Sequence, residues 1–377
     1  MIEIQEFATV EAALGKLDAF FRYENPSKVA PLKGAAAHEV AVGPVHAGVI
    51  EPGHFRFQTM GEDVYNLQIF LGYQHRGVEE EIVRARGNVP RQLALAETCA
   101  GDSSVAAATA LSEILESSVP AADRNIRGLL LELERIANHV GDLGALAGDV
   151  AYLPTSSFCG RIRGEYLNMT ALFCGNRFGR GAVVPGGVRA VVTPEKLDRF
   201  KTWISSAKKD LDGALALMFE EPTVIDRLSG TGTVPREIAR EYGLVGVARR
   251  ASVEFDGDVL ARAKVRRVEI EEAHAKIFSY LDALAATNIS RLGGSPAQSA
   301  GGGTGSARVV VSTVAAWRGP LVHAAAFDAN GAMIGYRIVD PSAHNWQGLA
   351  YALRGEQISN FPICNKSFNL SYCGTDR

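Results

Sequence analysis

The stretch Leu129-Leu-Leu-Glu-Leu-Glu-Arg-Ile-Ala-Asn-His-Val-Gly-Asp-Leu143 decides the fold class of this chain. Its apolar side chains recur at steps of about three, four or seven residues, which is the spacing of one face of an α-helix. The pattern continues in both directions and predicts a helix over residues 124–152. Asp123 is the candidate N-cap, and Pro154 is the residue expected to end the helix.

Other segments repeat this helical spacing on both sides of that stretch. They are residues 89–117, 158–177, 194–219 and 257–288. No strand pattern separates the long segments of the middle of the chain. The sequence therefore predicts that their helices pack together as a bundle.

Strand-like segments flank the predicted bundle. Residues 38–60 contain short strand-like runs separated by glycines and prolines that mark turns. This pattern favours a β-hairpin or small sheet. Near the other end, strands are predicted over residues 307–313, 321–328 and 333–339. The turn Asp328-Ala-Asn-Gly331 joins the last two as a hairpin, and a short helix near 346–354 follows.

The expected fold class is therefore α+β. It combines a long-helix bundle core with an N-terminal β-hairpin region and a C-terminal α/β segment. We expect residues 1–37 to form a short N-terminal arm and residues 38–377 to form one domain.

Composition narrows the function classes. The chain has 377 residues, of which 47% are hydrophobic and 21% charged, as is typical of a soluble globular protein. A net charge of -3 without a basic block argues against an autonomous nucleic-acid binder. No run of 18 apolar residues is present, and the acidic start Met1-Ile-Glu-Ile-Gln-Glu is unlike a signal peptide. We therefore expect a cytoplasmic location.

The cysteines do not form a recognisable metal motif. No two of them make a Cys-x-x-Cys pair, and no histidine cluster lies near them at the spacing of metal ligands. We expect buried, reduced thiols. The five are Cys99, Cys159, Cys174, Cys364 and Cys373.

One stripe of the predicted helix over residues 124–152 carries four polar side chains. Glu132, Arg135, His139 and Asp142 follow one another at spacings of three, four and three residues. In a bundle core these groups must pair or carry protons, because an unpaired buried charge is too costly. The alternative is a solvated face with ordinary ion pairs, and the residues alone leave both interpretations open.

Other polar residues carry weaker signals. His46, Glu51 and His54 lie among the turns of the first hairpin region, where such residues are more often structural than catalytic. Arg318, at a strand junction, has the pattern of an ion-pair partner. The glycines of residues 301–305 do not predict a phosphate-binding loop, because they follow a helix and precede a strand.

Six motifs identify a family resemblance. They are Gly43-Pro-Val-His-Ala-Gly-Val-Ile-Glu-Pro-Gly-His-Phe-Arg56, Leu71-Gly-Tyr-Gln-His-Arg-Gly-Val-Glu79, Leu131-Glu-Leu-Glu-Arg-Ile-Ala-Asn-His139, Val184-Pro-Gly-Gly-Val188, Gly257-Asp-Val-Leu-Ala-Arg-Ala-Lys-Val-Arg266 and Pro341-Ser-Ala-His-Asn-Trp346. In this order, they resemble the large subunits of membrane-bound, group 4 nickel–iron hydrogenases and the homologous large subunit of respiratory complex I.

The resemblance assigns the positions of the hydrogenase metal ligands. The first cysteine pair of that family corresponds to Glu97-Thr-Cys-Ala-Gly-Asp-Ser-Ser104, where Ala100 and Ser103 stand in the two cysteine positions. The second pair lies at the processed C-terminus, which Ser367-Phe-Asn-Leu-Ser-Tyr-Cys-Gly-Thr-Asp-Arg377 resembles, and there Ser371 and Gly374 replace the cysteines. The resemblance therefore implies no nickel–iron centre, because that centre needs four soft ligands.

In complex I, the corresponding cavity without metal forms part of a quinone pocket. Asp102 matches an aspartate of complex I, whereas Ser103 stands where complex I has the tyrosine that resembles the acid for the quinone headgroup. His46 and Ser103 are the candidates for lining a quinone cavity. The quinone-pocket histidine itself aligns with Ile50.

Hydrogenase-like features accompany these differences. Glu51 and His54 resemble the Ile-Glu-Gly-His motif of hydrogenases, in which the glutamate relays protons, and Arg318 resembles the arginine that overhangs the active site. Together with Asp102 and His139, they are the candidate catalytic residues for proton relay, and Glu132 is a further polar candidate.

The resemblance implies a metal-free large subunit of a membrane-bound, complex I-like oxidoreductase linked to NADH, quinone or ferredoxin. The chain itself is expected to bind no cofactor, apart from a candidate quinone, and to line a cavity near an iron–sulfur cluster of a partner small subunit. A complex I accessory-like hydrophilic subunit and membrane antiporter-like subunits are the other expected partners, at the cytoplasmic face of the membrane. Two alternatives are a non-redox subunit that anchors the small subunit, and a quinone-reducing subunit with a rearranged headgroup site.

Overall fold

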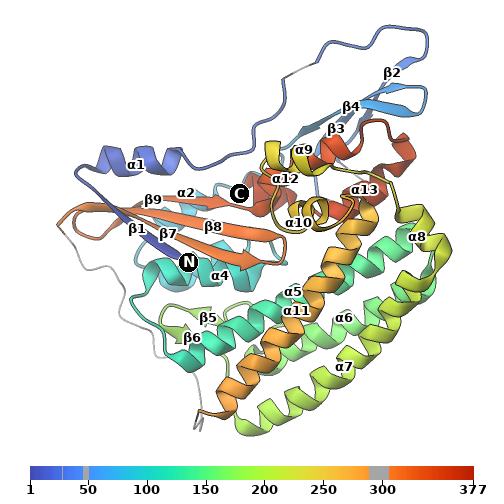
Figure 1. Cartoon of the computed structure of the whole chain (residues 1–377). Coiled ribbons are helices and arrows are strands. Elements are labelled where there is room, and N and C mark those ends of the chain that lie inside the picture. Colours follow the sequence, from blue (N-terminus) through green and yellow to red (C-terminus); the bar gives the residue numbers. More distant parts are fainter. Residues whose placement is uncertain (28, 46–50, 288–304) are drawn as a thin grey trace.

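Four long helices form the bundle predicted from the sequence. The computed structural model describes residues 1–27, 29–45, 51–287 and 305–377 (Figure 1). The bundle consists of α5 (Ala121–Asp149), α6 (Leu153–Cys174), α7 (Pro194–Glu220) and α11 (Val259–Ala285). The predicted helices over 158–177, 194–219 and 257–288 are thus confirmed with shifts of a few residues. His46, Ile50 and most of the glycine-rich loop before residue 305 lie outside the described residues.

The ends predicted for the central helix are wrong. Helix α5 begins at Ala121 with Pro120 as its N-cap, while the Asp123 carboxylate accepts a hydrogen bond from the Val188 amide at 2.9 Å. The helix stops at Asp149, and Pro154 lies in the first turn of α6. Proline is tolerated there because the first amide groups of a helix have no intrahelical acceptor. Pro154 therefore helps to begin a helix and does not end one.

The helix predicted over residues 89–117 is in fact two helices. They are α3 (Val89–Glu97) and α4 (Ser104–Leu115), separated by residues 98–103. The Arg76 guanidinium donates to the carbonyls of Thr98 and Cys99 at 2.9 and 3.1 Å, and Asn138 of α5 donates to the carbonyl of Asp102 at 2.9 Å. These long-range bonds satisfy backbone groups that an unbroken helix would have paired internally.

The main sheet joins the two ends of the chain. It has the antiparallel order β1 (Ile2–Phe7), β7 (Ala307–Ala316), β8 (Gly319–Phe327) and β9 (Met333–Val339). The predicted hairpin between β8 and β9 is confirmed, with Gly331 donating to the carbonyl of Asp328 at 3.0 Å. The expected arm over residues 1–37 instead contributes β1 to this sheet and α1 (Val10–Asp18) to one of its faces.

A smaller sheet confirms the strand signals of residues 38–60. Its antiparallel order is β2 (Ala37–Val42), β3 (His54–Met60) and β4 (Asp63–Phe70). The remaining elements are short: α2 (Val78–Arg84), β5 (Val183–Val184), β6 (Gly187–Val188), α8 (Pro222–Leu228), α9 (Arg236–Glu241), α10 (Gly246–Glu254), α12 (Pro341–Ala352), a 3₁₀ turn (Ile358–Asn360), α13 (Phe361–Phe368) and α14 (Tyr372–Asp376).

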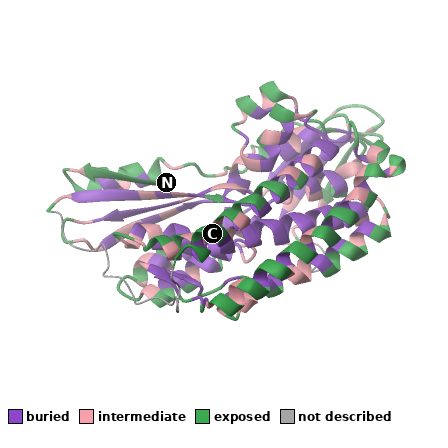
Figure 2. Cartoon of the chain, turned by 60° about the horizontal axis from the view of Figure 1, so that its bottom comes forward, coloured by how far each residue is buried: buried purple, intermediate pink, exposed green. Residues whose placement is uncertain are grey.

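One hydrophobic core connects the bundle with both larger sheets. Helix α4 is almost completely buried, because it packs on β7 and β8 and also contacts α5. The long helices turn their exposed residues outward and their buried residues toward this core (Figure 2). Among the described residues, no helix combines the length and apolar composition needed to cross a membrane. The predicted α+β fold class is thus confirmed.

Candidate functional site

Arg318 brings three distant segments together. It occupies the two-residue turn between β7 and β8, and its Nη1 and Nη2 donate to Oδ1 and Oδ2 of Asp102 at 2.7 Å each. Its Nε donates to the carbonyl of Asn369 at 2.7 Å, and its guanidinium carbon lies 3.9 Å from the centre of the Trp317 ring. The loop before α4, the sheet and the C-terminal tail therefore meet at one side chain.

A close backbone approach supports this turn. A Cβ atom on Gly246, at the start of α10, would lie only 2.0 Å from the Arg318 carbonyl oxygen, and Gly246 has a φ of +55°. Only glycine combines that conformation with that contact at no steric cost. Helix α10 thereby packs directly against the main chain that carries the arginine.

The carboxyl groups of Asp102, which is partly exposed, and of Asp340, which is buried, respond differently to Arg318. Burial alone would raise the pKa of Asp102, but the charge and hydrogen bonds of Arg318 outweigh it, so the pKa lies below its usual value. Asp340 is the N-cap of α12 and accepts from the Ser342 amide at 2.8 Å. Burial dominates there and raises the pKa of Asp340, although the Arg318 charge acts in the opposite direction.

The four positions that the resemblance predicts to correspond to metal ligands do not fit a nickel–iron centre. Ala100 offers a methyl group, and the Ser103 hydroxyl accepts from Trp317 Nε1 at 3.1 Å. The Ser371 hydroxyl caps α14 by accepting from the Gly374 amide at 3.0 Å. A Cβ atom on Gly374 would lie 2.5 Å from Asp340 Oδ2, so this position has no room for a cysteine side chain. Nickel requires soft thiolate ligands that this set does not provide.

The two neighbouring cysteines do not replace the missing thiolates. Cys99 is buried, and Cys373 is half-buried with its sulfur 3.5 Å from the Ser371 hydroxyl. Burial raises the pKa of Cys373 to about 12, and it raises the pKa of Cys99 even further. In the metal-free chain both are therefore neutral thiols near pH 7, and neither stands in one of the four predicted ligand positions. Cys159 and Cys364 are also buried and reduced, while Cys174 is half-buried.

Of the two candidates in the first hairpin region, the structure brings only Glu51 to the tail. Its Oε2 accepts hydrogen bonds from the amides of Tyr372 and Cys373 at 3.0 and 3.3 Å. His54 begins β3, where its Nδ1 lies 3.3 Å from the carbonyl of Gly43. Within the described ranges, His54 forms no hydrogen bond or ion pair with the Asp102–Arg318 group.

The polar stripe on α5 is buried, so its interpretation as a solvated face is wrong. Arg135 Nε donates to Glu132 at 2.9 Å, and Arg135 Nη1 lies 3.4 Å from Glu269 of α11. Asp142 accepts from Arg266 Nε at 2.9 Å and from the side-chain Nδ2 of Asn369 at 2.6 Å. The stripe therefore ties α5 to α11 and, through Asn369, to the segment that Arg318 also binds.

His139 connects the Trp317 side of the site to charged groups nearer the surface. The histidine is fully buried, its ring packs edge-on against Trp317, and its Nε2 lies 2.8 Å from Glu269 Oε2. The other oxygen of Glu269 accepts from Arg250 at 3.2 Å, and Arg250 also pairs with the exposed Glu272. Burial lowers the pKa of His139 despite the opposing carboxylate, so the imidazole is neutral near pH 7.

Sequence reasoning missed a carboxyl group beside this site. Glu134 Oε2 and Oε1 accept from the amides of Val105 and Ala106, at 2.7 and 3.3 Å, at the N-terminus of α4. Burial raises the pKa of Glu134 to about 8, although both amide bonds favour the carboxylate. Asp340 was also missed. The acidic residue directly before Pro341 is an N-cap signal, but no local pattern reveals that Glu134 reaches another helix.

Comparisons with known proteins agree on one kind of relative. The family described as "Respiratory-chain NADH dehydrogenase, 49 Kd subunit" matches residues 149–256. "Hydrogenase-4 component G" of Escherichia coli (strain K12) is 28% identical over 352 residues, which cover 90% of this chain and 62% of that protein. "Formate hydrogenlyase subunit 5" of the same organism is 26% identical, with 90% of this chain and 63% of that protein covered. This chain therefore spans less than two thirds of the length of those relatives.

Two further matches extend over whole proteins. "Carbon monoxide-induced hydrogenase" of Rhodospirillum rubrum is 25% identical, with 91% of this chain and 100% of that protein covered. A solved chain in the "membrane-bound sulfane sulfur reductase (MBS), an archaeal respiratory membrane complex" superimposes with a TM-score of 0.77. It is 22% identical and covers 91% of this chain and 99% of its own length, so this match establishes the fold.

Proposed function

We propose that this chain is the nickel-free large subunit of a complex I-like membrane-bound oxidoreductase. The premise is that the chain belongs to the family of complex I 49 kDa subunits and group 4 nickel–iron hydrogenase large subunits. It lies peripherally at the cytoplasmic face, against a small subunit that holds an iron–sulfur cluster. Accessory hydrophilic and antiporter-like membrane subunits complete the complex. The chain lines a cavity near that cluster and couples electron arrival to proton movement.

The contact of Arg318 with Asp102 and Asn369 carries this proposal. It joins both segments that correspond to the metal-binding motifs, and it places carboxyl groups where the metal ligands are missing. An electron on a nearby cluster adds negative charge, which raises the pKa of neighbouring carboxyl groups. Asp340 already has a raised pKa, so it is the group expected to take up a proton, whereas Glu134, with a pKa of about 8, already holds one near pH 7.

A route for that proton is suggested by the buried line from His139 to Arg250. The neutral His139 and the Glu269 carboxylate are in direct contact, and the Arg250 cluster leads on to solvent-exposed carboxylates. A histidine with one protonated nitrogen can accept a proton on the other and release it on the first. Arg135 forms a direct ion pair with Glu269, and Arg266 forms one with Asp142.

Metal analysis tests the nickel-free part of the proposal. The complex is purified through this chain, and nickel and iron are measured per polypeptide together with hydrogen evolution. We expect less than about 0.1 nickel per chain and no hydrogen evolution, because the four ligand positions offer no thiolate. Iron is the internal control, since the cluster of the small subunit supplies it. Stoichiometric nickel contradicts the proposal.

Proton uptake on reduction tests the coupling. The purified complex is photoreduced in weak buffer with a pH indicator, and we expect uptake by the wild type that is diminished in Asp340→Asn. Complete absence of uptake in a complex that still contains the small subunit favours the structural alternative. One observation supports that alternative: the hydroxyls of Ser103 and Ser371 are already used in hydrogen bonds within the chain. Quinone-dependent turnover abolished by Asp102→Asn or His54→Ala would instead indicate a quinone reductase.

A further inference from the structure

We propose that the free edge of β1 receives an extended segment of a partner subunit as a fifth strand of the main sheet. The inference rests on the proposed function in one respect, because the partner is taken to be another subunit of the same complex. It concerns a face of the molecule formed by β1, the end of α4 and the start of α5 (Figure 1).

The hydrogen bonds of β1 leave half of its backbone groups unpaired. Met1 and Thr313 exchange two bonds of 2.8 Å, which marks them as a bonded pair of the antiparallel ladder. Bonded and non-bonded pairs alternate, so Glu3 and Gln5 also point their amides toward β7. The amides and carbonyls of Ile2, Ile4 and Glu6 consequently point to the open edge.

The opposite edge of the same sheet is closed. In β9, the amide of Ile338 donates to Glu79 Oε1 of α2 at 2.8 Å, and the neighbouring Arg337 pairs with Glu79 and with Asp18 of α1. Proteins commonly protect edge strands in this way, or with proline, lysine or a bulge. Strand β1 contains no proline, lysine or bulge, and among the described residues no side chain bonds to its outer edge. It exposes Ile2 by 47% and Ile4 by 65%.

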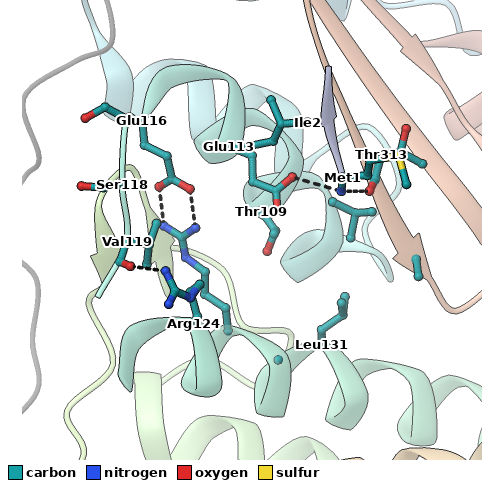
Figure 3. Close-up of a pocket in the computed structure, with 15 residues that line it drawn as sticks. Met1, Ile2, Thr109, Glu113, Glu116, Ser118, Val119, Arg124, Leu131 and Thr313 are labelled. Carbon is teal, nitrogen blue, oxygen red and sulfur yellow. Dashed lines mark hydrogen bonds and ion pairs between the residues drawn. The ribbon is translucent and has the colours of Figure 1, made fainter. Parts of the chain in front are cut away.

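Hollows lie on both faces of the sheet beside β1. The hollow on the α4 face has a cavity volume of about 570 Å³ and is lined by Ile2, Glu113 and Leu131 among others (Figure 3). The hollow on the α1 face has a volume of about 700 Å³ and is lined by residues such as Glu3 and Val311. An added strand directs its side chains alternately to the two faces, so one extended segment can fill both hollows.

One lining group on the α4 face lacks a partner. Thr109 is only 7% exposed, and its hydroxyl forms no hydrogen bond within the described part of the chain. The charged neighbours are already occupied: Arg127 makes two bonds of 2.7 Å to Glu116, and Glu113 accepts from Ser312. A polar side chain or carbonyl of the incoming segment can satisfy Thr109.

The chemistry of β1 favours a different chain over a second copy. The strand carries Glu3 and Glu6 and no cation, so pairing two copies would place four carboxylates on one ladder. The expected segment alternates apolar residues, which fill the hollows, and carries lysine or arginine opposite those glutamates. Strand addition gives affinity through main-chain bonds and specificity through such side-chain hollows.

Amide hydrogen exchange of β1 tests the proposal. The free chain and the purified complex are compared by mass spectrometry with fragmentation that resolves single amides. We expect Ile4 and Glu6 to exchange at least about tenfold more slowly in the complex. Glu3 and Gln5 are internal controls, because their bonds to β7 protect them in both samples. Equal exchange of Ile4 and Glu6 in both samples overturns the proposal, and protection that depends on the concentration of the free chain assigns the edge to a second copy instead.

Ile4→Pro provides the matched variant. It removes one outward amide and leaves the bonds to β7, so we expect a nearly unchanged unfolding midpoint but loss of the protection of Glu6 in the complex. Ile4→Val keeps the amide and should behave as wild type, whereas Gln5→Pro should lower the midpoint. An intact complex with an unprotected edge rejects the added strand and leaves the proposed function standing. A protected edge in a complex that takes up no proton on reduction rejects the function and leaves the strand.

Discussion

Arg318 shows how one side chain can hold a site that three segments build. Its guanidinium matches a carboxylate through two parallel bonds, which a lysine cannot reproduce because an ammonium group has no planar fork. It also covers the Trp317 ring and binds the tail through a carbonyl. Loss of this residue therefore affects the loop before α4 and the tail together.

We expect Arg318→Met to lower the free energy of unfolding by about 2–3 kcal/mol, because it leaves Asp102 without its partner. This cost is smaller than that of breaking a fully buried pair, because the Asp102 side chain is 34% exposed to solvent. Urea unfolding of Arg318→Met, Asp102→Asn and the double variant gives the coupling energy. A double variant as unstable as the sum of the single variants would falsify a direct Asp102–Arg318 interaction.

Glu134 should make the stability of the fold decrease as pH rises. Its pKa is raised from the usual 4.5 to about 8, so between these values the folded chain holds a proton that the unfolded chain has released. The destabilisation grows through this window and reaches a value on the order of 5 kcal/mol above pH 8. Denaturant midpoints from pH 5 to 8.5 should fall for the wild type and fall less for Glu134→Gln. Parallel profiles contradict the assignment, whatever constant offset the lost hydrogen bond adds.

Residue-level prediction from the sequence reached the members of the site but not their pairing. Motif positions pointed to Asp102 and Arg318. These residues are 216 positions apart in the sequence, with the bundle helices between them, so no local signal predicts their bond. Glu134 lies within the Leu131–His139 motif and escaped notice, because its acceptor role depends on where α4 begins. Contacts with residues of other helices and strands thus decide which polar residues act together.

At the level of elements, periodicity predicted the long helices and failed where tertiary contacts override it. One helix was predicted through the break between α3 and α4, although Gly101-Asp-Ser103 is a turn signal, and the bonds from Arg76 and Asn138 hold that backbone out of a helix. Strand β1 was missed for a related reason. Its six residues are too short and too exposed to show a buried face, and its partner β7 is remote in the sequence.

Close helix packing predicts opposite effects for two glycines. A Cβ atom on Gly144 of α5 would lie 2.7 Å from the Cys159 Cβ of α6, whereas one on Gly160 of α6 would meet no atom within 4 Å. We expect Gly144→Ala to destabilise the fold by about 1–3 kcal/mol through overpacking. Gly160→Ala should stabilise it by about 0.5–1 kcal/mol through helix propensity. Thermal unfolding of both variants is the measurement, and equal shifts would contradict the packing of α5 on α6.

On the scale of the whole molecule, the C-terminal tail binds both to the segment that follows the small sheet and to α2, which packs on the main sheet. The Asp376 carboxylate accepts from the amides of Gly72 and Gln74 at 2.8 and 2.9 Å, directly after β4. Arg377 approaches Glu79 of α2, and the amide of Arg76 donates to its carbonyl at 2.8 Å. Residues about three hundred positions apart are therefore held side by side.

Asp376→Ala should loosen that connection. It removes the charged acceptor of two partly buried hydrogen bonds, which costs about 1–3 kcal/mol. We expect the amides of Gly72 and Gln74 to exchange faster in the variant, while those of β8 in the centre of the main sheet remain unchanged. Exchange measured by mass spectrometry on the isolated chain checks this, and unaltered protection at Gly72 and Gln74 would rule out the proposed role of Asp376.

The pairing of β1 with β7 also has a consequence for synthesis on the ribosome. The bond between Met1 and Thr313 spans 312 positions, so the first strand emerges long before its partner exists. At usual elongation rates, about 15–60 s separate the two events. During that time an extended segment with two isoleucines is available to chaperones or to neighbouring nascent chains, and the sheet can close only near the end of translation.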